Sequence, residues 1–191
     1  LKSSQLAIVG TRNPTHYGVR VAGDFAAGFV DRGWCITSGG AYGIDTHAHR
    51  GAIAAEGVTY AVLASGVSVN YPAGNEKLFN EIAESGALVS EVMPKERARP
   101  ERFLTRNRII AALSKSTMVV EAAEISGALS TARHALRMQR LVLAVPGSIH
   151  SKSSVGTNEL IRNREAESVT NLQQVLELIL PLGQIPTKAS L

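Results

Sequence analysis

Short runs of apolar residues recur along the chain, and most of them end at a glycine or at a small polar residue. Continuous apolar runs of this kind are typical of strands that are buried on both faces of a parallel sheet. The pattern predicts six strands, at residues 5–9, 34–37, 58–63, 87–92, 117–122 and 141–145.

The segments between these runs carry apolar residues three and four positions apart, which is the spacing of one face of a helix. We predict helices at residues 19–32, 44–56, 75–85, 104–113 and 128–138. Strands that alternate with helices form a mostly parallel sheet with helices on both faces. The predicted fold class is therefore α/β.

The pattern weakens after Gly156. We expect a short helix to Arg162, a polar stretch at 163–167 and an amphipathic helix at 172–180. This organisation predicts one domain over residues 1–180 and a linker over residues 181–191. Because the first residue is Leu rather than Met, we also expect a piece of a longer protein whose flanking domains are absent.

Composition narrows the class of protein. A hydrophobic content of 45% with 17 glycines and only 4 Phe, 4 Tyr and 1 Trp fits an α/β layer protein. No apolar run reaches the length of a membrane span, and the start has no signal-peptide pattern. The single cysteine, Cys35, excludes an internal disulfide and is expected in the apolar core. We expect a cytoplasmic protein with no membrane contact.

The positive charge of the chain is concentrated in one segment. Residues 95–108 hold six cations and two anions around one aromatic residue, Phe103. The excess of four positive charges equals the formal net charge of the whole chain, +4. Single-stranded nucleic acid offers phosphates to such cations and bases to such a ring. A charge run alone is more often a solvated surface, so the interpretation depends on the surrounding motifs.

Small residues follow most of the predicted strands. In a parallel sheet, ligands bind at the carboxyl ends of the strands, where loops meet helix N-termini. Five such loops leave backbone N–H groups open to an anion: 10–12, 38–40, 65–66, 126–128 and 146–148. The candidate contacts in two of them are Ser38, Gly39, Gly40, Ser126 and Gly127. Arg12, on the first loop, could direct its guanidinium at a phosphate, or could instead pair with a carboxylate such as Asp45.

Three residues of the basic segment are spaced so that they share one helix face. Phe103, Arg106 and Asn107 lie at i, i+3 and i+4, provided that the helix begins by about residue 103. That face would present a ring, a guanidinium and an amide to the loops. Arg108 should point away from it. The alternative for Phe103 is an ordinary core position.

Cofactor and metal signatures are weak. The loop at 38–43 reads Gly-Gly-x-x-Gly rather than Gly-x-Gly-x-x-Gly, no acidic residue follows at the ribose-binding distance, and there is no P-loop motif. We therefore predict no cofactor. Asp45 and His49 are too few ligands for a metal, so Asp45 is expected to cap its helix.

Catalytic signatures are equally weak. No Gly-x-Ser-x-Gly elbow is present. The best carboxylate pair is Glu121 and Glu124, after the fifth predicted strand, and we do not expect it to make this chain an enzyme.

Five motifs together resemble one family. They are Ala7-Ile-Val-Gly-Thr-Arg12, Ser38-Gly-Gly-Ala-Tyr-Gly-Ile-Asp45, Phe103-x-x-Arg-Asn-Arg-Ile-Ile-Ala111, Ser126-Gly-Ala-Leu-Ser-Thr-Ala132 and Ala144-Val-Pro-Gly147. Their order is that of the DprA family of DNA-processing proteins, also called Smf, which act in natural transformation. The resemblance covers roughly residues 5–180.

The resemblance implies an extended Rossmann-like domain that binds single-stranded DNA without catalysis and without sequence preference. It further implies protection of incoming strands, loading of the RecA recombinase and a homodimer formed through this domain. By motif, Arg12 becomes the principal phosphate contact, Phe103 the base-stacking ring and Arg106 a support of the pocket. Arg99 and Arg102 are added as candidates from their charge alone.

One segment departs from the family pattern. After Leu160-Ile-Arg162 the family usually has a Gly-Ala pair, whereas this chain has Asn163-Arg-Glu-Ala166, in the part where the family's dimer contacts lie. Two alternative functions stay open. One is a nucleotide-processing enzyme of the related LOG (phosphoribohydrolase-like) fold, which would use Glu121, and the other is a pure interaction module.

Overall fold

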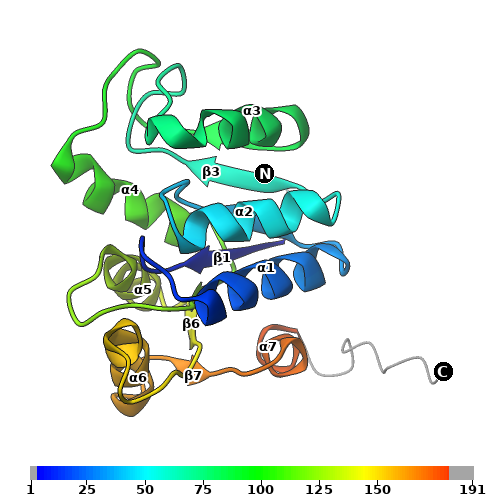
Figure 1. Cartoon of the computed structure of the whole chain (residues 1–191), viewed down its shortest axis with the longest axis vertical. Coiled ribbons are helices and arrows are strands. Elements are labelled where there is room, and N and C mark those ends of the chain that lie inside the picture. Colours follow the sequence, from blue (N-terminus) through cyan, green and yellow to red (C-terminus); the bar gives the residue numbers. More distant parts are fainter. Residues whose placement is uncertain (1–3, 181–191) are drawn as a thin grey trace.

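A computed structural model describes residues 4–180 of the chain. One sheet of seven strands runs through this part, in the order β4-β3-β2-β1-β5-β6-β7, and every neighbouring pair in it is parallel (Figure 1). The strands are β1 (Gln5–Val9), β2 (Cys35–Ser38), β3 (Thr59–Val62), β4 (Ala87–Val89), β5 (Ser116–Val119), β6 (Leu141–Ala144) and β7 (Glu167–Ser168).

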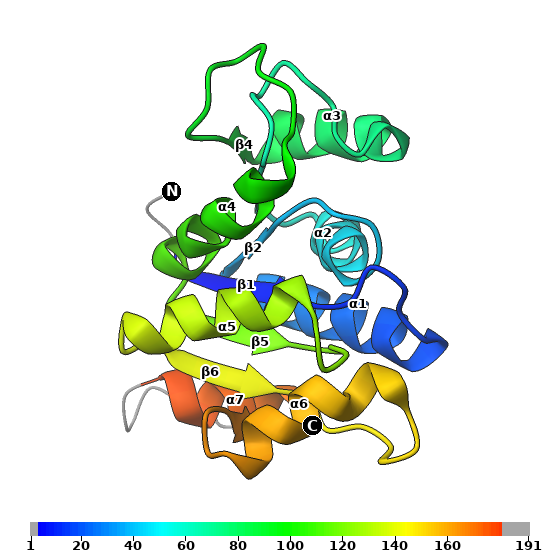
Figure 2. The same cartoon turned by 90° about the vertical axis from the view of Figure 1, so that its left-hand side faces the viewer.

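Seven α-helices lie within the described residues; six of them stand between consecutive strands and α7 follows β7. They are α1 (His16–Val30), α2 (Ile44–Ala54), α3 (Glu76–Ser85), α4 (Pro100–Leu113), α5 (Gly127–Arg137), α6 (Val155–Arg162) and α7 (Leu172–Ile179). Figure 2 shows α4, α5 and α6 in front of the sheet, and α1, α2 and α7 lie on its other side.

Alternate side chains of each strand enter two different cores. In β1, Leu6 and Ile8 pack with α1, α2 and α7, whereas Ala7 and Val9 pack with α4, α5 and α6. All four side chains are buried. This two-sided burial explains why the strands read as continuous apolar runs rather than as alternating ones. The predicted α/β, Rossmann-like architecture is confirmed, and so is the core position of Cys35.

Two predictions about the elements were wrong. The polar stretch at 163–167 contains the start of a seventh strand, because Glu167 and Ser168 pair with the edge of β6 while both are exposed, so no apolar run marks them. The helix expected from residue 104 begins at Pro100. Proline fits the first turn of a helix because its fixed φ is helical and it needs no N–H partner there. The expected linker at 181–191 lies outside the described residues.

The contact between α1 and α2 depends on a close backbone approach. A Cβ atom added at Gly51 would lie 2.6 Å from the carbonyl oxygen of Gly23, whereas one added at Gly23 would meet nothing within 4 Å. Gly51→Ala is therefore expected to lower the free energy of unfolding by about 1–3 kcal/mol through overpacking. Gly23→Ala, the matched control on the facing helix, should raise it by about 0.5–1 kcal/mol. Urea unfolding measures both, and equal effects of the two variants would contradict this packing.

Candidate nucleic-acid interface

A cavity of about 280 Å³ opens at the carboxyl ends of β1 and β5. β1 has β2 on one side and β5 on the other, so the connections leave this point in opposite directions along the sheet. Open α/β sheets bind ligands at such a switch point. The cavity is lined by the loop after β1 (residues 10–12), the first turns of α4 and the loop from β5 into α5.

Arg12 reaches the mouth of this cavity from the loop after β1. The loop is fixed on both sides, because the N–H of Thr11 donates to the carbonyl oxygen of Glu121 (2.7 Å) and the carbonyl oxygen of Thr11 accepts from the N–H of Ile44 (3.1 Å). The exposed guanidinium of Arg12 lies over the ring of Phe103, with Cζ 5.2 Å from the ring centroid. Among the described residues Arg12 forms no ion pair, so the alternative of a pair with Asp45 is not what the structure shows.

Phe103 lies in the first turn of α4 and lines the cavity. Its side chain is partly exposed, so the alternative of a core position is not observed. The ring of Tyr71, from the loop after β3, lies 5.5 Å away between centroids at an interplanar angle of 59°. Since α4 begins at Pro100, the predicted shared face of Phe103, Arg106 and Asn107 is formed, and all three line the cavity.

Arg106 is buried, although its charge suggested a cation that is free to bind a phosphate. It is only 6% exposed, and its guanidinium donates to the carbonyl oxygens of Gly39 (2.7 Å) and Val62, where β2 and β3 end. Its Nε donates to Oδ1 of Asn107 at 3.2 Å. Burial lowers the pKa of Arg106 to about 10, which the nearby Asp45 partly opposes and Arg12 adds to, so the side chain stays charged at neutral pH. Its hydrogen bonds hold strand ends together behind the cavity.

The 38–40 loop lies behind the cavity rather than on its wall. Ser38 is fully buried and its hydroxyl donates to the carbonyl oxygen of Ile8 at 2.6 Å. The N–H of Gly39 donates to Oδ2 of Asp45 at 3.0 Å, and Gly40 is buried with a φ of 67°. None of the three lines the cavity. The expectation that Asp45 caps its helix was wrong, because the N-cap is Gly43 and the Asp45 carboxylate anchors this loop instead.

The N-terminus of α5 faces the cavity. Ser126 is its N-cap, and the Ser126 hydroxyl accepts from the N–H of Ala128 at 3.3 Å. The side-chain amide of Asn107 donates to the carbonyl oxygen of Gly127 at 3.1 Å and so ties α5 to α4. Ser126, Gly127 and Ala128 all line the cavity. The positive end of a helix with open N–H groups favours an anion at this place.

The two arginines that were added from charge alone lie apart from the cavity wall. Arg102 donates to Oε2 of Glu96 (2.8 Å) and to the carbonyl oxygen of Arg97 (2.7 Å). The Arg102 hydrogen bond and charge lower the pKa of Glu96. Arg99 is the exposed N-cap residue of α4. Arg108 points away from the shared face, as predicted, and pairs with Glu91.

The sequence and the fold were compared with those of known proteins. The family described as DNA recombination-mediator protein A matches residues 1–180. A putative DNA processing protein DprA of Mycobacterium tuberculosis is 46% identical over 179 residues, which cover 94% of this chain and 46% of that protein.

The chain belongs to the DNA recombination-mediator protein A family.

Solved structures of the family have the same fold. DNA processing protein A of Streptococcus pneumoniae superposes with a TM-score of 0.87 at 36% identity, over 94% of this chain and 63% of that one. The Helicobacter pylori protein, which binds single-stranded DNA, superposes with a TM-score of 0.85 at 32% identity, over 92% of this chain and 80% of that one. The chain spans about half the length of the curated DprA and Smf relatives that it matches.

In this DNA recombination-mediator protein A domain, the two candidate catalytic carboxylates do not face one cavity. Glu121 is 2% exposed, and its carboxylate accepts from the N–H of Thr15 (2.9 Å) and from the Thr15 hydroxyl (2.5 Å). It thereby anchors the N-cap of α1. Glu121 and Glu124 line two different cavities, neither of which is the one at Arg12. Within residues 4–180, no three His, Cys, Asp or Glu side chains are grouped so that they could hold a metal ion.

The sequence did not single out several residues of this site. Tyr71 is one of them, because a lone aromatic residue outside any periodic segment carries no signal of its contacts. Leu104 and Ile125 line the cavity while they are 55% and 95% exposed. An Ile within the polar loop between β5 and α5, outside any apolar run, is a signal that could have been used. No helix of the described part is long and apolar enough to cross a membrane.

A buried histidine next to the site makes stability depend on pH. His49 is fully buried, its Nδ1 lies 2.7 Å from the Thr59 hydroxyl, and burial together with the charge of Arg106 lowers its pKa to about 3 from an ordinary 6.5. Between these two pH values the unfolded chain binds a proton that the folded chain does not, so stability falls as the pH falls below about 6.5. The raised pKa of Asp45 acts in the opposite sense, because burial favours its protonated form.

We therefore expect His49→Gln to be less stable than the parent at pH 7 but to lose less stability on acidification. The parent should lose up to about 1.4 kcal/mol more per pH unit than the variant between pH 6 and 4. Urea unfolding at a series of pH values measures this, with the exposed His150→Gln as the control. Parallel pH profiles of the parent and His49→Gln would contradict the prediction.

Proposed function

We propose that this chain binds single-stranded DNA at the cavity between Arg12, Phe103 and the N-terminus of α5, without sequence preference and without catalysing a reaction. One observation carries the proposal. An arginine and a partly exposed aromatic ring meet at 5.2 Å on the wall of a cavity that also receives the open end of a helix. One nucleotide could therefore place its phosphate at the arginine and the helix end, and its base on the ring.

The phosphate is bound by charge and by backbone donors. Arg12 is exposed, forms no ion pair among the described residues and lies on the same cavity as Ser126 and Gly127. A guanidinium can donate two parallel hydrogen bonds to one phosphate, while the N–H groups at the start of α5 add further donors. These contacts read no base, so the binding is independent of sequence.

The base stacks on Phe103 while Asn107 contacts its edge or the sugar. Stacking on an aromatic ring tolerates every base, but it needs an unpaired one, because paired bases hide their faces inside the duplex. Ser38, Gly39, Gly40 and Arg106 act from behind by fixing the strand ends. Arg99 lies outside this cavity, and Arg102, which pairs with Glu96, would contribute only to the field that attracts a polyanion.

Membership of the family supports the wider role. We infer that the protein protects incoming single strands, delivers them to the RecA recombinase in the cytoplasm during natural transformation, and does so as a homodimer. The H. pylori relative, a single-stranded DNA binder of the same fold, supports the first of these steps.

A salt titration of binding to a labelled single-stranded oligonucleotide tests the proposal. Each phosphate that the protein neutralises on a single strand contributes about −0.7 to the slope of log affinity against log salt, so several contacts predict a steep loss. Unlabelled duplex should compete poorly. Phe103→Ala should lose about 1–3 kcal/mol of binding free energy with little change in the slope. A flat salt profile, or equal competition by duplex, would show that the site does not bind single strands.

A further inference from the structure

A second aromatic residue adjoins the proposed base-binding ring. Tyr71 is 47% exposed and comes from the loop between β3 and α3. Its ring lies against that of Phe103, on α4, with the centroids 5.5 Å apart. The two rings come from different elements and are tilted by 59° to each other, so each can offer a face to a different base.

The loop that carries Tyr71 is held in place by residues 40–46, at the start of α2 and just before it. Asn75 is buried, and its side-chain amide donates to the carbonyl oxygen of Gly40 (3.0 Å) and to the hydroxyl of Thr46 (2.9 Å). The N–H of Gly74 donates to the hydroxyl of Tyr42 at 3.2 Å. A ring that is held before binding loses little entropy when a base stacks on it.

The same loop lies beside the basic segment. The N–H of Gly66 donates to the carbonyl oxygen of Glu96 (2.8 Å), and the N–H of Ser68 donates to that of Pro94 (2.9 Å). Figures 1 and 2 show the two loops side by side at one end of the sheet, beyond α4. The exposed cations in the part of this segment that precedes α4 are Lys95, Arg97 and Arg99.

The opposite side of the cavity is less favourable to a polyanion. There, Glu124 and Glu159 line the neighbouring cavity with only Arg162 to offset them, and the third cavity has the Glu121 carboxylate on its wall. A single strand that leaves the Arg12 site therefore meets cations across Tyr71 and carboxylates in the other direction.

We propose that Tyr71 is a second base-stacking residue and that the strand runs from the Arg12 cavity across Tyr71 toward residues 95–99. This inference rests on the proposed function, because Tyr71 has a role only if the cavity beside it holds a nucleotide. Tyr71 stacks the next base along the strand, and the cations beyond it contact the backbone that follows.

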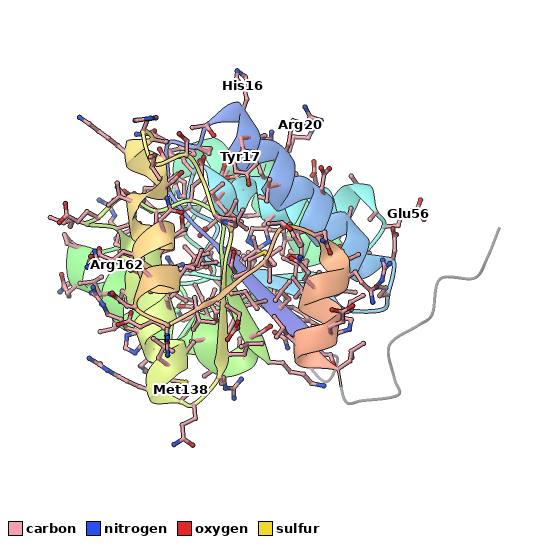
Figure 3. The ribbon with its side chains drawn as sticks, turned by 90° about the horizontal axis from the view of Figure 1, so that it is seen from below. His16, Tyr17, Arg20, Glu56, Met138 and Arg162 are labelled. Atoms are coloured by element: carbon pink, nitrogen blue, oxygen red, sulfur yellow. The ribbon has the colours of Figure 1, made fainter. Side chains whose placement is uncertain are left out.

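The test compares two ligands of equal length and charge, an oligothymidylate and an abasic deoxyribose-phosphate backbone. Tyr71→Leu should weaken oligothymidylate binding roughly 5- to 150-fold, the range for one stacked base, and should leave the abasic backbone unchanged. Tyr71→Phe should bind as the parent does. Tyr17→Leu is the matched control, because Tyr17 is 48% exposed but lies on the face seen from below in Figure 3.

A second readout does not depend on affinity. In Tyr71→Trp the new indole should be quenched by oligothymidylate and not by the abasic backbone, against the constant background of the buried Trp34. Equal quenching by both ligands, or oligothymidylate binding by Tyr71→Leu that matches the parent, would overturn the proposal.

The two proposals fail in different ways. If Phe103→Ala weakens binding to oligothymidylate alone while Tyr71→Leu has no effect, only the second base site is wrong. If the parent binds neither ligand, the proposed function itself is wrong.

Discussion

Arg106→Met is expected to lower the free energy of unfolding by about 3–5 kcal/mol, which is a large part of the stability of an ordinary domain. The change leaves the carbonyl oxygens of Gly39 and Val62 without their donor. It also removes the cation that favours the ionised form of the buried Asp45. A buried polar group that loses a hydrogen-bond partner bears a desolvation cost. Urea or thermal unfolding followed by circular dichroism measures the loss.

The control for this variant lies two residues further along α4. Arg108→Met removes an exposed arginine whose ion pair is with Glu91, and should cost no more than about 1 kcal/mol. Adding Asp45→Asn to Arg106→Met should recover part of the loss, because no carboxyl group then remains buried without a countercharge. Similar stability of the Arg106→Met and Arg108→Met proteins would refute the buried role of Arg106.

Arg12→Ala is the variant with the largest expected effect on DNA binding. The loss should be about 1.5–3 kcal/mol, the usual contribution of hydrogen bonds to a charged group, and it should be the same for every sequence. The salt slope should become shallower by about 0.7, because one phosphate is no longer neutralised. Stability should be unchanged, since the side chain is exposed. Fluorescence anisotropy with two oligonucleotides of different sequence, at several salt concentrations, measures both quantities.

Arg20→Ala is the matched control for Arg12→Ala. Arg20 is exposed on α1, on the face seen from below in Figure 3, and its removal changes the net charge by the same amount. Binding by Arg20→Ala should stay close to that of the parent. If both variants lose affinity equally, the effect comes from net charge, and the assignment of the phosphate to Arg12 fails.

Much of the fold could be predicted from the sequence, because a central strand that is buried on both faces consists of consecutive apolar residues. The exceptions share a cause. Glu167 and Ser168 form an exposed edge strand through backbone hydrogen bonds alone, and the first turn of α4 is specified by Pro100 rather than by apolar spacing. Neither feature alters the hydrophobic pattern on which the prediction relied.

The meeting of Arg12 with the Phe103–Asn107 face could also be predicted, because spacing and strand order bring them to one rim. The hydrogen-bond and ion-pair partners of the individual side chains could not be predicted. Arg106 donates to carbonyl oxygens at the ends of β2 and β3, and the hydroxyl of Ser38 donates to the carbonyl oxygen of Ile8. These contacts depend on how distant segments pack together, which no local sequence pattern indicates. The ion pair of Arg102 with Glu96 depends on the path of a loop without periodicity.

The position of Arg12 over Phe103 has a consequence for the selection of ligands. Before any strand arrives, the guanidinium already occupies the ring, so a base must displace it. A phosphate offers the displaced arginine a new partner, whereas a free nucleoside or nucleobase offers it none. If the site binds DNA as proposed, unphosphorylated nucleosides and nucleobases are thus expected to compete poorly with a phosphorylated strand.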